Sequence, residues 1–322
     1  MLCNALINDS MPHALLFTGE DGVGKATAAI EIAKVCNCAG ISGSQKPQKD
    51  TAPEQHLSAC GICRFCRKIE HGTHPDFHVI KPAGAYIRID QIRDLCGRLA
   101  LRPDEATNRF VLIADAHTMN PEAGNALLKI LEEPPEATFF VLTAPDTQDL
   151  LPTIVSRCRH VRFNPIPQQE LAEYLGRRCG LDNENAAIIA ALARGSLARA
   201  LDMVSADWLT RRNFIIQRLR RLARQPTAFR LAFAEMLAAD KANLEVIFEI
   251  MKNWYRDLAV FAHFPGHIYN QDLREQIRSA CEQEPLETIL EKSDAIDRAQ
   301  KSLSGNANVR LALDVLLMEL AA

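Results

Sequence analysis

A glycine-rich segment near the N-terminus, Gly19-Glu-Asp-Gly-Val-Gly-Lys25, constrains the fold of this chain more than any other feature. The apolar run at residues 14–18 precedes it and predicts a buried strand, and residues 26–36 follow with the pattern of a helix. Strand, glycine loop and helix form a phosphate-binding loop (P-loop), in which backbone N–H groups surround phosphate and the lysine reaches it. The sequence therefore predicts an α/β domain with a parallel sheet.

One chemical group of a complete P-loop is missing. Ala26 occupies the position at which such loops carry the Ser or Thr hydroxyl that holds Mg²⁺. Thr27 offers a hydroxyl one residue further on, but a helix turns about 100° per residue, so we count Thr27 only as a vestigial part of the site. A glycine-rich turn without function is the alternative, which the flanking strand and helix disfavour. The groups that can still contact phosphate are Gly19, Gly22, Gly24 and Lys25.

A second apolar run, residues 110–113, predicts the strand that ends in a Mg²⁺-binding Asp and a catalytic Glu in P-loop ATPases. Here the sequence continues Ala-Asp-Ala-His. In one register Ala114 replaces the Asp and Asp115 replaces the Glu. In a register shifted by one residue, Asp115 remains a metal ligand and no base is left. Both registers weaken metal binding and water positioning, so we expect little or no ATP hydrolysis by the chain alone.

Three cysteines recur at two-residue intervals in Cys60-Gly-Ile-Cys63-Arg-Phe-Cys66. Three sulfur ligands favour Zn²⁺, and a closed structural site needs a fourth, which Cys36 or Cys38 can supply. The stretch 39–58 between them is rich in Gly, Ser, Lys, Gln and Pro and is predicted as a loop. A redox pair, unrelated buried thiols and an iron–sulfur cluster are the alternatives. Three downstream histidines are possible competing ligands: His71, His74 and His78.

Length and composition limit the class of protein. A chain of 322 residues, 48% of them hydrophobic, predicts two or three domains. We expect a cytoplasmic protein, because no apolar run approaches the length of a membrane span and no signal peptide is indicated. A net charge of −3 argues against a surface that binds nucleic acid throughout. Residues 208–224, with six arginines and no acidic residue, are either a local nucleic-acid-binding face or a solvated helix face.

The segment Asn125-Ala-Leu-Leu-Lys-Ile-Leu-Glu-Glu-Pro-Pro135 resembles the helix that follows this strand in the bacterial clamp-loader subunits of DNA polymerase III. The resemblance spans nearly the whole chain. It implies an AAA+ P-loop domain, a structural zinc module inserted after the P-loop helix, a small lid and a helical collar. The other matching segments are residues 74–78, 89–93, 151–158, 195–200 and 306–314.

The resemblance also implies domain boundaries and a zinc ligand set. Residues 1–165 would form the AAA+ domain, with the zinc module at about 38–66, followed by a three-helix lid at 166–206 and an all-α collar for oligomerisation at 207–322. The match of Ala33-Lys-Val-Cys-Asn-Cys38 favours Cys38 over Cys36 as fourth ligand. The implied zinc ligands are Cys38, Cys60, Cys63 and Cys66.

The departures at Ala26 and Ala114 make the chain look like the family member that contributes structure and an arginine, rather than like the γ and τ chains that hydrolyse ATP. The resemblance implies that Arg157, in Ser156-Arg157-Cys158, enters the ATP site of a neighbouring subunit as an arginine finger, with a surface arginine as the alternative. Arg199 matches the lid arginine that senses nucleotide, or is an ordinary surface arginine. Ala144 and Pro145 stand where the family has a polar sensor of the γ-phosphate.

The resemblance further implies that the chain is a component of a DNA-directed DNA polymerase holoenzyme, a nucleotidyltransferase. Its partners would be γ/τ and δ subunits in a hetero-oligomeric ring, the sliding clamp and, indirectly, primed DNA. No membrane partner is expected. An active γ/τ-like ATPase and a stand-alone P-loop nucleotide-binding switch are the alternatives. ATP binding stays open, because the P-loop lysine is present.

Overall fold

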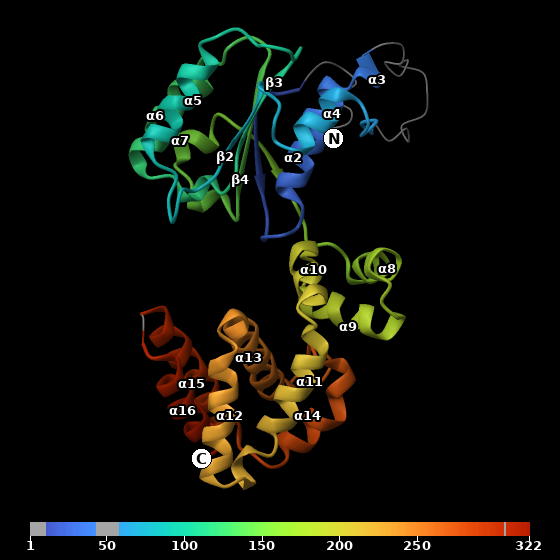
Figure 1. The fold of residues 1–322 in the computed structure, drawn as a ribbon, viewed down its shortest axis with the longest axis vertical. Helices are drawn as coiled ribbons and strands as arrows, with labels where there is room; N and C mark the ends of the chain where they lie inside the picture. Colours follow the sequence, from blue (N-terminus) through green and yellow to red (C-terminus); the bar gives the residue numbers. More distant parts are fainter. Residues whose placement is uncertain (1–10, 43–57, 306) are drawn as a thin grey trace. The chain divides into compact units, whose positions relative to one another are not determined.

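The computed structural model describes residues 11–42, 58–305 and 307–322. The chain divides into two compact units, Met1–Pro165 and Ile166–Ala322 (Figure 1). The first unit contains all the described strands, and the second is entirely helical in its described part. A parallel α/β unit followed by a helical region is the fold class that the sequence predicts.

The first unit is built on a parallel sheet with the strand order β2-β3-β4-β1-β5. Every residue of β1 and β3 is buried, as expected for parallel strands that are covered on both faces. Because all strands run in one direction, their carboxyl ends meet at one end of the sheet and their amino ends at the other. The strands are β1 Ala14–Thr18, β2 Phe77–Ile80, β3 Arg109–Ile113, β4 Thr138–Ala144 and β5 Arg159–Arg162.

Helices cover both faces of this sheet (Figure 1). Leu15 and Phe17 of β1 pack with the helices α2 and α4, whereas Leu16 packs with α5, α6 and α7 on the opposite face. This alternation follows from the two-residue period of a strand. The helices are α2 Lys25–Asn37, α3 Ala39–Ser42, α4 Arg64–Glu70, α5 Ile89–Leu99, α6 Pro121–Glu132 and α7 Pro152–Val155.

The second unit shares one continuous hydrophobic core. Helices on both sides of the predicted boundary at residues 206/207 contribute to it, so the division into lid and collar stays a prediction. The last helix, Val309–Glu319, has an apolar stripe inside this core, with Leu313, Leu316 and Leu317 buried. The helices are α8 Gln168–Cys179, α9 Asn183–Ala193, α10 Leu197–Ser205, α11 Trp208–Leu219, α12 Thr227–Ala239, α13 Leu244–Phe261, α14 Arg274–Cys281, α15 Leu286–Ser304 and α16 Val309–Glu319.

Two sequence predictions need correction. The stretch 39–58, predicted as a loop, begins with the short helix α3, and its residues 43–57 lie outside the described part of the chain. The arginine-rich stretch 208–224 is not exposed throughout: Arg220, Arg221 and Arg224 are exposed, but Arg212 is not. Arg212 of α11 is buried, and both of its terminal nitrogens donate to the Asp272 carboxylate, at 2.9 and 2.5 Å. Burial of a cation requires such a partner, so this arginine serves the core.

No described helix combines the length and the apolar content that are needed to cross a membrane.

Candidate functional site

The P-loop lies at the carboxyl end of β1 and leads directly into α2. Its three glycines all have positive φ, at 142° for Gly19, 78° for Gly22 and 99° for Gly24, a region that side chains disfavour. A Cβ atom on Gly19 would also lie 2.4 Å from the carbonyl oxygen of Phe163. The glycine spacing in the sequence therefore reflects the backbone path of a genuine P-loop.

Lys25 is bound by its own loop. Its side chain is buried, and Nζ donates to the carbonyl oxygens of Gly19, at 2.5 Å, and of Glu20, at 2.9 Å. It also lies 3.3 Å from a carboxylate oxygen of Asp21. A phosphate that enters the loop would have to replace these contacts, so the lysine is not held free for a nucleotide.

The two positions that lack metal ligands face the same space. Ala26 and Ala114 both line a cavity of about 900 Å³ that runs along β2. Asp115 follows Ala114 in a left-handed conformation, with φ of 53°, and its backbone N–H donates to the hydroxyl of Thr143 at 3.0 Å. Thr27 is exposed on the first turn of α2. The structure thus brings together the two alanines that the sequence identified as substitutions in one metal site.

Four cysteines gather beyond the other end of α2. The Sγ atoms of Cys38, Cys60, Cys63 and Cys66 all lie within 4.8 Å of one another. Sulfur atoms around a tetrahedral Zn²⁺ at about 2.3 Å are separated by about 3.8 Å, so the cluster matches such a site. Cys36 is not part of the group, and neither are the three downstream histidines. These four thiols could hold one zinc ion in a closed site with no open position for chemistry.

Backbone donors prepare this cluster for a cation. Burial raises the pKa of Cys63, but the backbone N–H groups of Cys66 and Ala39 donate to its sulfur and lower that pKa to about 6 overall. Burial raises the pKa of Cys66 to about 12. A bound divalent cation would favour the thiolate form of every ligand.

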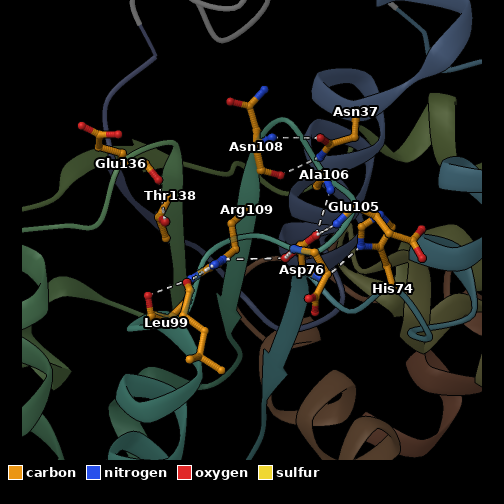
Figure 2. Close-up of polar contacts among 12 residues, drawn as sticks. Asn37, His74, Asp76, Leu99, Glu105, Ala106, Asn108, Arg109, Glu136 and Thr138 are labelled. Carbon is orange, nitrogen blue, oxygen red and sulfur yellow. Dashed lines mark hydrogen bonds and ion pairs between the residues drawn. The ribbon is translucent and has the colours of Figure 1, made fainter.

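A polar network ties the end of α2, next to the cysteine cluster, to the amino end of the sheet, and Figure 2 shows its residues. The Asn37 side chain at the end of α2 exchanges hydrogen bonds with the backbone of Asn108, which precedes β3. The Asp76 carboxylate accepts three backbone N–H groups, from Asp104, Glu105 and Ala106, at 2.8 to 2.9 Å. These bonds fix the loop before β3 against the loop before β2.

Arg109 and His74 complete this network. Arg109 is buried, lies 3.9 Å from Asp76 and donates to the carbonyl oxygens of Leu99 and Leu101. Burial raises the pKa of Asp76, but the three backbone donors outweigh it, so that pKa is lowered. His74 accepts the backbone N–H of Asp76 through Nδ1 at 3.1 Å, and burial lowers its pKa. His74 is therefore a neutral core histidine rather than a metal ligand.

Arg157 follows α7 and lies two residues before β5, at the amino end of the sheet. Its Nη2 contacts Oε1 of Glu132 at 2.5 Å, and its Nη1 donates to the carbonyl oxygen of Thr153 at 2.9 Å. The Arg157 side chain retains 34% of its exposure and the Glu132 side chain 50%. Both Lys25 and Arg157 are fixed by contacts, but only the Arg157 side chain remains accessible to solvent.

Arg199 lies in the first turn of α10 in the second unit and forms an ion pair with Glu249 of α13. Both side chains are half-buried. The first unit contains the P-loop and the second contains Arg199, so the sensing role that the resemblance implies stays a prediction.

Sequence reasoning missed Asp76, Arg109 and Glu132. Asp76 and Glu132 lie inside segments that carried the family resemblance, and Arg109 directly precedes the apolar run 110–113. A buried ion pair between residues 33 positions apart leaves no periodic signal in a sequence. The sequence offered one sign of this ion pair. Arg109 is a charged residue at the first position of a strand whose other residues are apolar, so its burial requires a partner.

Comparisons with known proteins agree with this architecture. Residues 1–167 match a family model described as DNA polymerase III, delta subunit, and residues 206–321 match another, described as DNA polymerase III, delta subunit, C terminal. The chain is 28% identical to DNA polymerase III subunit delta′ of Bacillus subtilis, across 99% of this chain and 94% of that protein. It is 30% identical to subunit delta′ of Pseudomonas aeruginosa, across 96% and 92%. It is 26% identical to subunit tau of Bacillus subtilis, across 99% of this chain and 59% of that protein.

Proposed function

Because the chain belongs to the family of DNA polymerase III delta′ subunits, we propose that it is a non-hydrolysing clamp-loader subunit. It would join γ/τ and δ subunits in a ring that loads the sliding clamp onto primed DNA. Its own catalytic contribution would be Arg157, which acts in the ATP site of a neighbouring subunit.

The observation that carries this proposal is the contrast between two cations of the first unit. Lys25 is buried and bound to its own loop beside two missing metal ligands. Arg157 lies at the opposite end of the sheet and remains accessible. A chain with this arrangement would contribute little to the hydrolysis of ATP in its own P-loop. It keeps an arginine that can donate hydrogen bonds to ATP bound by another chain.

The chemistry of the proposed finger follows from the guanidinium group. It is planar, permanently charged and able to donate two parallel hydrogen bonds to phosphate oxygens. In the transition state of phosphoryl transfer, negative charge spreads over the transferred group, and a fixed cation at that point lowers the barrier. Arginine fingers of this kind are worth roughly 10³ to 10⁵ in rate.

The chain's own P-loop would act as a scaffold. The hydroxyl and the carboxylate that hold Mg²⁺ are replaced by Ala26 and Ala114, which removes the ion that neutralises phosphate charge and orients the attacking water. These two alanines are also the reason that an active γ/τ-like ATPase is disfavoured. A stand-alone nucleotide switch is disfavoured by the match to delta′ subunits over nearly the whole chain.

We further propose that the four-cysteine cluster binds a structural Zn²⁺. The sulfur separations and the donor set support it. Its ligands come from the end of α2, from the turn that leads into α4 and, with Cys66, from the first turn of α4, so the ion would fasten the start of α4 to α2. All four positions around the ion would be filled by protein, which leaves it no part in ATP hydrolysis.

The test is to assemble the complex with its ATPase partners and to compare single-turnover ATP hydrolysis for wild type and Arg157→Ala. We expect the site that this chain completes to lose roughly 10³-fold in rate, because the transition-state contact is lost. Arg159→Ala is the matched control, since Arg159 is an exposed arginine two residues away. Equal rates for the two variants would refute the finger. Strong hydrolysis by the isolated wild-type chain would refute the non-hydrolysing assignment.

A further inference from the structure

The partner of Arg157 has a role of its own. Resting on the function proposed above, we propose that Glu132 is a positioning residue, which holds the Arg157 guanidinium in the orientation that a neighbouring phosphate requires. The two residues come from different elements. Glu132 ends α6, and Arg157 lies just after α7. Their contact therefore fixes the side chain relative to the body of the first unit and not only to its own loop.

The guanidinium is held at two points. One terminal nitrogen contacts Glu132 at 2.5 Å, and the other donates to the carbonyl oxygen of Thr153 at 2.9 Å and lies 3.4 Å from the Ser156 hydroxyl. Two anchors on different nitrogens define the plane of the group as well as its position. A guanidinium has five N–H donors, so these contacts leave donors for a phosphate.

The location of Glu132 argues against a merely local role. It is the last residue of α6, where the helix macrodipole is negative and a carboxylate is disfavoured. Among the described residues, its carboxylate has one hydrogen-bond partner, Arg157. An acidic residue at the wrong end of a helix, with its charge directed at one arginine, is explained by what it does to that arginine.

The strength of the pair suits a positioning role. With side-chain exposures of 34% and 50%, solvent screens the charges, and exposed ion pairs contribute little to stability. A deeply buried pair would keep the guanidinium from a phosphate. This pair restricts the rotamers of a long side chain and still lets its outer donors exchange water for phosphate. Holding a donor in place before the reaction is a recognised source of rate.

The experiment uses the reconstituted complex and five variants of this chain, one of which is the double variant Arg157→Ala/Glu132→Ala. We expect Glu132→Ala to lower kcat about threefold with KM for ATP unchanged, since the contact acts in the transition state. Glu132→Gln keeps a hydrogen-bond acceptor and should restore most of the loss. Glu133→Ala, at the adjacent exposed glutamate, should match wild type. In an Arg157→Ala background, Glu132→Ala should have no further effect.

The outcomes separate this inference from the function on which it rests. If Arg157→Ala lowers the rate and Glu132→Ala leaves it unchanged, the positioning role is wrong and the finger stands. If Glu132→Ala raises the rate, the carboxylate restrains the arginine and the inference is also overturned. If Arg157→Ala itself has no effect, both fail. Equal thermal unfolding midpoints for all variants would show that the kinetic changes do not arise from unfolding.

Discussion

The two ends of the parallel sheet differ in the state of their polar groups. At the carboxyl end, the P-loop has the backbone of a nucleotide site, but Lys25 is bound by its own loop and Ala26 and Ala114 provide no metal ligand. At the amino end, the Asp76 carboxylate accepts three backbone N–H groups, the cysteine cluster has the spacing of a metal site, and Arg157 is accessible.

The difference shows that a chain can keep the backbone of a motif and lose the side chains that carry its chemistry. The glycines at the carboxyl end still determine how the strand passes into α2, so the loop keeps its shape for structural reasons. Hydrolysis depends on side chains, and at two of those positions this chain carries Ala26 and Ala114. Substitutions at the carboxyl end should therefore have small effects and substitutions at the amino end large ones, which the following predictions test.

The largest effect should come from the cysteine cluster. We expect Cys38→Ala to reduce bound zinc from one ion per chain towards none, because a structural site needs all four ligands. The free energy of unfolding should fall by more than about 4 kcal/mol, since zinc binding in small domains is worth about 10–16 kcal/mol. Elemental analysis and denaturant unfolding measure the two quantities.

The matched control is Cys36→Ala, because Cys36 lies two residues away and outside the cluster. It should retain the metal. Loss of zinc from Cys36→Ala, with retention by Cys38→Ala, would reverse the ligand assignment. Wild-type protein that contains no zinc after purification without chelator would remove the metal site altogether.

A smaller effect, of about 3 kcal/mol, is expected for Asp76→Asn at neutral pH. The amide carries no charge and accepts hydrogen bonds more weakly, so the backbone donors of residues 104–106 and the buried Arg109 lose part of their partner. Denaturant unfolding at pH 7 measures the difference. A change below about 0.5 kcal/mol would show that the network does not stabilise the amino end.

The same variant gives a pH signature. The pKa of Asp76 in the folded chain lies below its ordinary value of 3.8, so its stabilisation is complete above that value and is lost as the pH falls. The difference between wild type and Asp76→Asn should therefore be largest near neutral pH and should narrow below about pH 5. A difference that stays constant down to pH 3 would contradict the carboxylate as its source.

The sequence predicted the elements whose signals are local. Strand β1 has the predicted bounds, and the glycine spacing located the P-loop. The cysteine spacing, together with the family resemblance, selected the four thiols that the structure brings together. These features depend on neighbouring residues or on a short repeated interval, which a sequence displays directly.

The sequence could not predict contacts between distant segments. Arg212 was counted among the surface arginines, although Asp272, sixty positions away, draws it into the core. The Glu132–Arg157 pair and the Asp76 network arise where elements from separate parts of the chain end at the same edge of the sheet. Such contacts depend on strand order and crossover geometry, and no local pattern encodes them.

The smallest effect is expected at the carboxyl end, from Lys25→Ala in the reconstituted complex. In an active P-loop ATPase this lysine contacts the β and γ phosphates, and its loss would abolish hydrolysis. Here its three contacts are all within its own loop, so we expect the hydrolysis rate of the complex to change less than about twofold. A loss comparable to that of Arg157→Ala would show that this loop holds a working nucleotide, and the contrast between the two ends would then fail. If the rate is unchanged and the unfolding midpoint falls because the contacts of Lys25 are lost, the role of Lys25 is only to stabilise the P-loop.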